Sequence, residues 1–333
     1  MDGYPVDNSI WALTDDRAGN VAQTLGVAEA LGRPFTVKDI GYTPLAKLPS
    51  VLQGASLLGL TGESRMGLAA PWPALVIAAG RRTAPAARWI KRQSGGKTRI
   101  VQIMYPGRRA AADFDLIAVP RHDCEIPGGD AANILRIIGA PHRLTEKRLA
   151  EAAEAWSPRF NMLRRPFVAV MVGGATHSRP FPASFAADLG RRAADMAASL
   201  NGSVLLTTSR RTGADAEAAL LATIPEPRHV FLWGRGGDNP YLGYMALADR
   251  IIVTGDSVSM CSEACATGKP VHIYAPSDLV GAKHARLHRE LYDQGLATPL
   301  ESPAVRQGQP LNAATEIAHA IERLLGENNA ARN

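Results

Sequence analysis

The feature that most constrains the fold of this chain is a unit of strand, polar loop, short helix and strand near residue 260. Arg250–Val253 and Val271–Tyr274 are short apolar runs rich in β-branched residues, which is typical of buried strands. The segment between them, residues 254–269, reads TGDSVSMCSEACATGK. Its helix-compatible residues end at Gly268, a residue suited to the position just after a helix. The unit therefore predicts one repeat of a parallel α/β sheet.

The start of this helix carries the residues of a phosphate site. Its positive end is entered through Asp256, Ser257, Ser259 and Met260, where unpaired backbone N–H groups and hydroxyls can hold an anion. Glu263 lies one turn inside, where a carboxylate can accept hydrogen bonds from a ribose diol. The alternative is plain helix capping, because the same residue types cap helices, with Glu263 an ordinary helix residue. This segment alone leaves both interpretations open.

The same succession of strand, polar loop and helix occurs in both halves of the chain. Its 333 residues favour two domains. In the first half, apolar strands are predicted at 10–13, 35–40, 74–79, 100–104 and 116–119, with a further strand or irregular run at 133–138. After a linker-like segment at 157–166 the pattern restarts at Phe167. We therefore expect one Rossmann-like domain over residues 1–158 and a second over 165–333. The last helix, near 315–325, is expected to pack back on the first domain.

Four loops of the second half follow predicted strands of one parallel sheet, so they should emerge at the same edge. Besides the loop that opens the helix near residue 260, these loops carry Gly173, Gly174, His177, Ser178 and Arg179, then Ser209 and Arg210, and then Trp233. Glycines let the backbone approach a diphosphate, arginines supply forked donors, and a tryptophan can contact a base. Although arginines often pair with surface acids, the four loops together predict a nucleotide site.

In the first half, the loop after the first strand carries Asp15 and Asp16. Either carboxylate could act as a general base across a cleft from the second domain. Capping of the following helix is the simpler interpretation of the same residues.

Several other classes of site lack support. No Gly-x-Gly-x-x-Gly follows a strand, and neither a Walker-type loop nor Gly-x-Ser-x-Gly occurs. His284 and His288 have the spacing of a zinc pair but lack a third ligand, so we interpret them as part of a solvent-facing basic helix. No metal or other cofactor is expected. Three cysteines cannot form a disulfide framework, which favours a reducing, cytoplasmic compartment, and Cys261 and Cys265 are interpreted as small buried residues.

The net charge of +6 and the pI near 9.4 indicate an anionic partner. One stretch without acids holds the basic residues Arg81, Arg82, Arg88, Lys91, Arg92, Lys97 and Arg99. With Trp89 exposed, it could contact an anionic membrane surface at the inner face; with Trp89 in the core, it is a solvated basic face. No nucleic-acid motif, signal peptide or membrane-spanning run is found.

Two motifs resemble the ELM (elongated mitochondria) family of mitochondrial fission factors and bacterial relatives. These are WALTDDRAGN at residues 11–20 and TGDSVSMCSEA at residues 254–264. More distantly, the second motif is similar to the donor site of GT-B glycosyltransferases such as the lipid-linked peptidoglycan enzyme. There an equivalent Glu holds the ribose and the helix start holds the diphosphate. In the first loop, Asp15, Asp16 and Arg17 stand where those enzymes have a Gly-rich loop with a His.

The resemblance implies an α/β fold of two Rossmann-like domains facing a cleft, with a nucleotide-sugar in the second. It implies a glycosyltransferase with a lipid or cell-envelope acceptor. Two alternatives remain open. A GT-B-type nucleotide-sugar epimerase would share the donor site but would need an acid/base set. A non-enzymatic adaptor that recruits a fission partner at a membrane would not bind a nucleotide.

Overall fold

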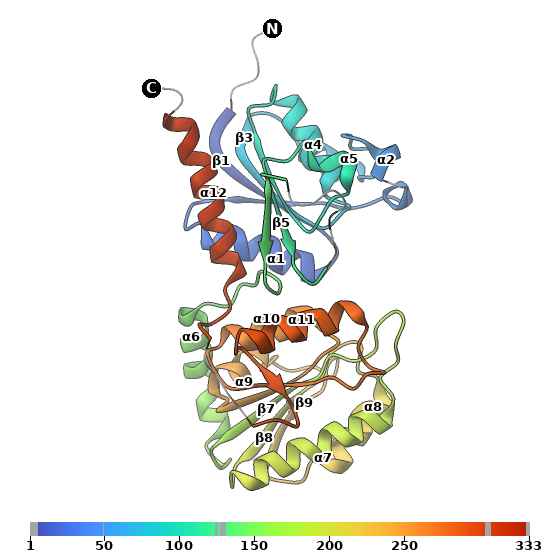
Figure 1. The fold of residues 1–333 in the computed structure, drawn as a ribbon, viewed down its shortest axis with the longest axis vertical. Coiled ribbons are helices and arrows are strands. Elements are labelled where there is room, and N and C mark those ends of the chain that lie inside the picture. Colours follow the sequence, from blue (N-terminus) through green and yellow to red (C-terminus); the bar gives the residue numbers. More distant parts are fainter. Residues whose placement is uncertain (1–5, 49, 124–125, 127–130, 304–307, 331–333) are drawn as a thin grey trace. The chain divides into compact units, whose positions relative to one another are not determined.

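A computed structural model describes residues 6–48, 50–123, 126, 131–303 and 308–330. The chain forms two compact units. The first contains Met1–Arg143 and Asn312–Asn333, and the second contains Leu144–Leu311 (Figure 1). Cys124 and the loop at 128–130 lie outside the described residues.

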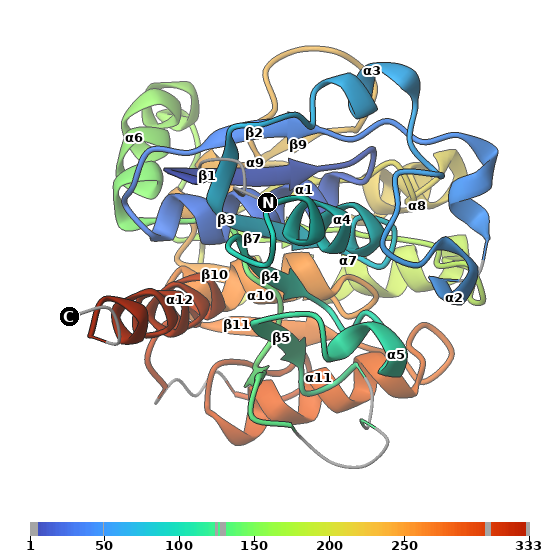
Figure 2. The ribbon, with the colours of Figure 1, turned by 90° about the horizontal axis from the view of Figure 1, so that it is seen from above.

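The first unit is built on a six-stranded parallel sheet. Its strands are β1 (Val6–Thr14), β2 (Thr36–Asp39), β3 (Trp72–Ala79), β4 (Arg99–Ile103), β5 (Leu116–Pro120) and β6 (Ile134–Ile137). Their spatial order is β2-β1-β3-β4-β5-β6, and the first five can be followed in this order in Figure 2. The order reverses between β1 and β3, which makes this pair the topological switch point of the sheet.

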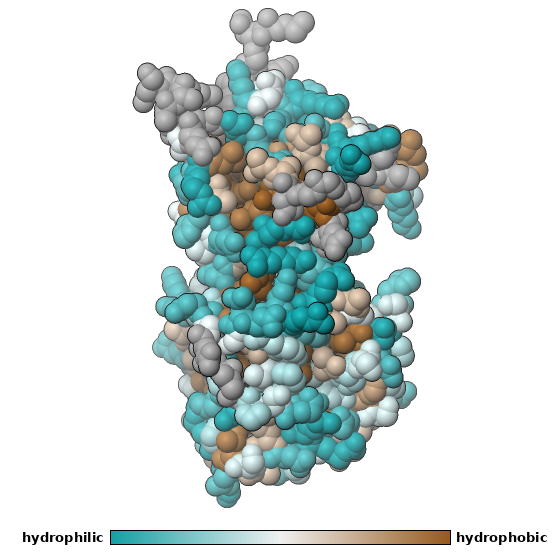
Figure 3. Space-filling model, in the orientation of Figure 1, coloured by the Kyte–Doolittle hydropathy of each residue, from teal (hydrophilic) through white to brown (hydrophobic). Residues whose placement is uncertain are grey.

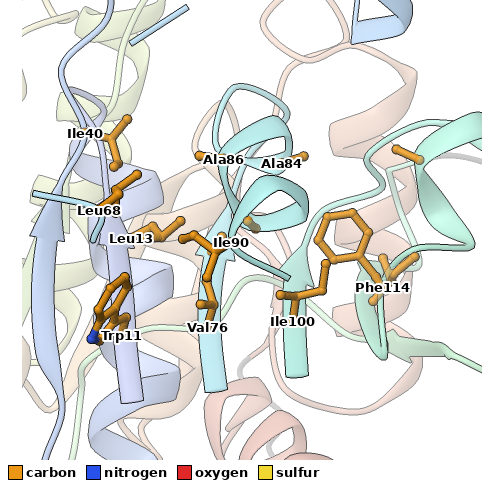
Figure 4. Packing of buried hydrophobic residues seen from close by; sticks show 14 of the residues in the cluster. Trp11, Leu13, Ile40, Leu68, Val76, Ala84, Ala86, Ile90, Ile100 and Phe114 are labelled. Carbon is orange, nitrogen blue, oxygen red and sulfur yellow. The ribbon is translucent and has the colours of Figure 1, made fainter. Parts of the chain in front are cut away.

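Helices bury both faces of this sheet. Alternate side chains of each strand point to opposite sides, so each strand contributes residues to two cores. On β1, Trp11 and Leu13 join one core with Ile90 of α4 (Ala84–Gln93), as Figure 4 shows. Ile10 and Ala12 join the other core, which is covered by α1 (Ala18–Ala30) and α12 (Ala313–Ala330). The remaining helices of the unit are short: α2 (Ser50–Gln53), α3 (Gly62–Met66), α5 (Arg108–Ala111) and the 3₁₀ turn Pro44–Lys47.

The second unit repeats this architecture. Its strands are β7 (Phe167–Met171), β8 (Ser203–Thr207), β9 (Arg228–Phe231), β10 (Arg250–Thr254), β11 (Val271–Tyr274) and β12 (Thr298–Pro299). They lie parallel in the order β12-β11-β10-β7-β8-β9. The chain order reverses between β7 and β10, so these two strands form the switch point.

Helices cover both faces of the second sheet. They are α6 (Glu146–Trp156), α7 (Ala183–Ser199), α8 (Ala214–Thr223), α9 (Tyr241–Leu247), α10 (Val258–Ala266) and α11 (Ala282–Asp293), with a 3₁₀ turn at Ser157–Phe160. Figure 1 shows α7 and α8 on one side, and α9, α10 and α11 on the other. The prediction of an α/β chain with two Rossmann-like sheets is confirmed.

The boundary between the units differs from the one expected at residues 158–165. The helix α6 was assigned to the first domain, yet it belongs to the second unit. The physical reason is its contact with α9, where Gly243 leaves room for the Trp156 ring. A Cβ on that glycine would collide with the ring. At the other end of the chain, Ile317 and Ile321 of α12 pack into the core of the first unit beside Val27.

Candidate functional site

Three loops at the carboxyl edge of the second sheet are bonded to one another at the switch point. The loop after β7 donates its Gly173 N–H to Thr254 Oγ1 (2.8 Å) and its Gly174 N–H to Asp256 Oδ2 (3.0 Å). The Gly173 carbonyl accepts hydrogen bonds from Thr212 (2.9 Å) and from the Ser209 hydroxyl. The loops after β7, β8 and β10 therefore form one preorganised surface.

An ion pair between a partly exposed arginine and a buried aspartate joins the loops after β8 and β10. Arg211 Nη1 lies 2.8 Å from Asp256 Oδ2, and the Asp256 side chain is 0% exposed. Burial raises the pKa of Asp256, and the nearby Arg211 guanidinium opposes that shift. Asp256 was predicted to contact the nucleotide, but its carboxylate is enclosed by the loops. We therefore assign it to holding the loops together.

The two glycines after β7 are required by this packing. A Cβ on Gly173 would collide with the Asp256 carboxylate, and a Cβ on Gly174 would collide with the Arg211 backbone. Gly174 also has φ +131°, a conformation that side-chain-bearing residues rarely adopt. Both glycines were predicted to give the backbone access to a diphosphate, whereas here they admit the neighbouring loops.

The start of α10 has the open backbone groups expected of an anion site. Ser257 is the N-cap, and its side chain accepts from the Met260 N–H at 3.4 Å. Within the described chain, the N–H groups of Val258 and Ser259 have no acceptor, as is usual for the first turn of a helix. Residues 257–260 are partly exposed. The N-terminus of α10 can therefore receive an anion.

One turn further, Glu263 is held by a tyrosine that the sequence did not reveal. The Tyr241 hydroxyl, from α9, donates to Glu263 Oε2 at 2.6 Å. Burial raises the pKa of Glu263, and the hydrogen bond from Tyr241 opposes that shift. Among the described residues no donor contacts Oε1, so one oxygen of the carboxylate remains an acceptor for a ligand.

The other predicted residues of these loops differ in accessibility. His177, Ser178 and Arg210 are exposed. Trp233 is half exposed, and its backbone N–H donates to Thr208 Oγ1 at 2.9 Å. Arg179 is already engaged, since its Nη1 donates to the carbonyls of Ser277 (3.0 Å) and Asp278 (3.1 Å).

The interpretation of α11 as solvent-facing at His284 and His288 is wrong. His288 is buried, and its Nε2 lies 2.9 Å from the Gly255 carbonyl. Burial lowers its pKa to about 4, so the ring is neutral at neutral pH. His284 is half-buried beside the Asp256 backbone, and burial lowers its pKa as well. Leu287 and Leu291 are buried on the same face of the helix, and this apolar spacing could have indicated the burial.

With this geometry in view, comparison with known proteins identifies relatives. A family model described as "Mitochondrial fission ELM1" matches residues 18–325. The chain belongs to the mitochondrial fission ELM1 family. It is 30% identical over 306 residues to "Mitochondrial fission protein ELM1" of Arabidopsis thaliana, covering 84% of this chain and 70% of that protein. It is 28% identical to "Uncharacterized protein RP120" of Rickettsia prowazekii (strain Madrid E), covering 94% and 98% of the two chains.

Solved structures share the fold at low sequence identity. One is the UDP-GlcNAc 2-epimerase of Methanocaldococcus jannaschii in complex with UDP-GlcNAc and UDP. Its TM-score is 0.54 at 12% identity, covering 96% of this chain and 99% of that chain. Another is the glycotransferase of kitacinnamycin, with a TM-score of 0.53 at 15% identity, covering 96% and 100%. This family member therefore has a GT-B-type fold.

In the first unit, the two predicted acids lie at the other switch point. Asp15 accepts from the Arg17 N–H (3.0 Å) and from Asn20 Nδ2 (3.0 Å), and Arg82 lies 3.3 Å away. Its buried carboxylate is thus committed to local contacts. Asp16 is exposed and pairs with Arg82, whose hydrogen bond lowers the pKa of Asp16. Neither acid caps α1, where Arg17 is the N-cap residue without a side-chain bond.

Three residues that organise the second unit's site were not predicted as site residues. Arg211, Tyr241 and Thr254 each bond a residue that is distant in sequence. Over the described residues, no group of three or more His, Cys, Asp or Glu side chains could hold a metal ion. Cys261 and Cys265 are buried in α10.

Proposed function

We propose that this protein binds a nucleoside-diphosphate sugar in its second unit and transfers the sugar to a lipid or cell-envelope acceptor. The observation that carries the proposal is the position of Glu263 and the α10 N-terminus. Both belong to the helix that follows β10, at the switch point between β7 and β10. Ligands of open α/β sheets bind at such points.

Each part of a nucleoside diphosphate has a partner of suitable chemistry. The phosphates would accept hydrogen bonds from the Val258 and Ser259 N–H groups at the positive end of α10. The ribose diol would donate to Glu263 Oε1, about one helical turn or 5.4 Å further along. Arg210 and Trp233 are exposed on the two loops beside this edge, where they are available for charge and ring contacts.

The relatives of this fold support the ligand class. The archaeal epimerase was solved with UDP-GlcNAc and UDP, and the same fold serves a glycotransferase. We favour transfer over epimerisation because Asp16 is the one exposed acid of the first loop motif, paired with Arg82. A single carboxylate can act as the base for an acceptor hydroxyl, whereas epimerisation requires an acid/base set.

The proposal is tested by calorimetric titration with UDP, ADP, GDP, CDP and TDP. Wild type should bind at least one of them. Glu263→Ala should weaken that binding tenfold or more, since charge-assisted hydrogen bonds contribute about 1.5–3 kcal/mol each. Glu263→Gln should cost less because one acceptor oxygen remains. Asp215→Ala, which removes an exposed acid of α8, is the matched control. Unchanged affinity in a well-folded Glu263→Ala protein would end the assignment.

Attachment to a membrane surface is a second candidate, and one surface feature favours it. Exposed apolar side chains gather in one segment of the first unit, and Figure 3 shows brown residues over α2. They are Val37, Leu45, Leu48, Leu52, Leu58 and Met66. Over the described residues, no helix is both long and apolar enough to cross a bilayer.

The predicted basic stretch contributes less to such a surface than its composition indicates. Arg88 pairs with Asp113 (2.6 Å), and Lys91 and Arg99 pair with Asp115 (2.7 Å each). Trp89, expected to be exposed in this interpretation, packs edge-to-face on Trp72, with ring centroids 5.6 Å apart. The exposed cations of the stretch are Arg81, Arg92 and Lys97.

A further inference from the structure

A cavity of about 410 Å³ opens at the amino-terminal edge of the second sheet. It lies between the C-terminal half of α7, the starts of β10 and β11, and the segment at 300–303. Its volume falls within the range of small-molecule sites. The α10 N-terminus follows the opposite, carboxyl end of β10, so this cavity is separate from the proposed nucleotide site.

A buried histidine with an unused nitrogen lines the cavity. His272 is 2% exposed, and its Nε2 is buried without a hydrogen-bond partner. Its Nδ1 lies 3.4 Å from Thr298 Oγ1 on the neighbouring strand. Burial lowers the pKa of His272, and the cation of Arg250 adds to that shift. A neutral imidazole nitrogen without a partner is costly in a protein interior, and a ligand atom in the cavity would satisfy it.

The charged side chains of the lining leave one cation available. Arg192 is engaged by Asp188 (2.9 Å) and Glu301 (3.4 Å). Arg250 forms no ion pair or side-chain hydrogen bond with the residues that the structure describes. Asp195 is exposed and also lines the cavity. Because its carboxylate repels anions, the cavity would accept only one compact anionic group, near Arg250.

The rest of the lining is apolar or hydroxylic. Met196, Leu200 and Leu300 offer an apolar wall, and Ser199 and Ser302 offer hydroxyl groups. Small-molecule sites combine an apolar wall with a few convergent polar groups in this way.

We propose that this cavity is a second binding site, for a small amphipathic anion. Its carboxylate or phosphate group would bind Arg250 and accept a hydrogen bond from His272 Nε2, and its apolar body would pack on Met196 and Leu300. Guanidinium groups bind both kinds of anion through paired N–H donors. A ligand here would contact the start of β10, whose other end carries one loop of the proposed nucleotide site.

The test uses the full chain with ¹³C-labelled histidine and four probes that share one apolar body: hexanoate, hexyl phosphate, hexanol and hexylammonium. One or both anions should shift the His272 ring signal in a saturable way, and the preferred anion identifies the head group. Hexanol and hexylammonium should act at least tenfold more weakly. Arg250→Gln should weaken anion binding tenfold or more. Arg191→Gln removes an exposed arginine of α7 that does not line the cavity, and it should bind as wild type does.

The partly exposed position of Met196 provides a second variant. Met196→Trp should fill the cavity and abolish the response if Arg250→Gln does not fold. Three results would overturn the proposal: no response to either anion, an equal response to hexanol, or undiminished binding in a folded Arg250→Gln protein. Displacement of the anions by UDP would also overturn it, because it would assign them to the nucleotide site.

Discussion

The hydroxyl of Tyr241 donates a hydrogen bond to Oε2 of Glu263 over 2.6 Å, which joins α9 to α10. The bond fixes the orientation of the carboxylate, and among the described residues it leaves Oε1 without a hydrogen-bond donor. It also favours the ionised form of Glu263, against the burial that raises its pKa. Tyr241 therefore acts on the proposed ribose contact through Glu263, as a positioning residue.

Nucleotide affinity should fall as the pH falls through the raised pKa of Glu263, because the protonated acid is the weaker acceptor. Tyr241→Phe removes the group that opposes this pKa shift, so the loss of affinity should begin at a higher pH than in wild type. Calorimetric titrations at several pH values between about 5 and 8 measure this. Tyr105→Phe, a change in the first unit, should leave the profile unchanged. Coinciding profiles of wild type and Tyr241→Phe would refute the positioning role.

Arg211→Met should destabilise the protein through the Asp256 carboxylate that it leaves unpaired. Breaking a buried ion pair costs about 3–5 kcal/mol. We expect about 2–3 kcal/mol here, because Arg211 is itself 34% exposed to solvent. Urea denaturation at pH 7.5 measures the difference.

The stability of Arg211→Met should also depend on pH in a different way from that of wild type. Arg211 lowers the pKa of Asp256, so its removal raises that pKa further above the unfolded value near 3.9. The native state then binds the proton more tightly than the unfolded chain does. The loss of unfolding free energy in Arg211→Met, relative to wild type, should therefore shrink as the pH is lowered toward 5. Arg210→Met, a change of the exposed neighbour, should leave stability at both pH values within about 0.5 kcal/mol of wild type. A deficit that does not depend on pH would contradict the assignment to Asp256.

The architecture could be predicted because local patterns of apolar residues determine it. Buried parallel strands are continuous apolar runs, and most were located to within a few residues, such as Ile10–Leu13 in β1 and Val271–Tyr274 in β11. The strand β12 was not predicted, because its two residues are too few to form such a run, and the segment of β6 was left open between a strand and an irregular run. The domain boundary was harder to predict from the sequence. Whether α6 belongs to one unit or the other depends on the space that Gly243 leaves for Trp156, a contact across more than 80 positions of sequence.

The loops that form the site could be predicted from the sequence, but the role of each residue in them could not. Parallel strands bring their carboxyl ends to one edge, so the loops after β7, β8 and β10 had to meet. Which residue bonds which is decided by packing. Asp256 is enclosed by Arg211, and Glu263 is bonded by Tyr241, and nothing in the spacing of these residues distinguishes an enclosed acid from an accessible one.

Gly173→Ala and Gly174→Ala should each destabilise the second unit by about 2–3 kcal/mol, since overpacking at a tight site costs about this much. The added Cβ at Gly173 meets the Asp256 carboxylate, and the one at Gly174 meets backbone atoms in addition to its strained φ. Gly62→Ala is the matched control, because a Cβ there meets no atom within 4 Å. Urea midpoints of the three variants test this. If Gly174→Ala matched Gly62→Ala in stability, the close approach of the loops would be disproved.

Vesicle binding tests the membrane candidate. Leu52 and Met66 are 67% and 77% exposed, so replacing both by Ser should weaken sedimentation with anionic vesicles without loss of stability. Arg92/Lys97→Ser should weaken it by about 1 kcal/mol per charge in low salt, and less in high salt. Arg286/Arg289→Ser, a change of two exposed cations on α11, controls for net charge. Equal sedimentation of all the variants would reject the surface.

His288 should make the stability of the second unit fall in mild acid. Its pKa is about 4 in the folded protein against about 6.5 in an unfolded chain, so the unfolded state binds the proton first as the pH drops. Stability from this group is complete above pH 6.5 and declines toward pH 4, by at most about 1.4 kcal/mol per pH unit. His288→Gln preserves a side-chain donor for the Gly255 carbonyl and removes the titration, so its stability should decline less steeply between pH 6.5 and 4.5. His319→Gln, at an exposed position of α12, should follow the wild-type slope. Equal slopes for wild type and His288→Gln would mean that this ring is not held neutral against the loop that carries the proposed nucleotide site.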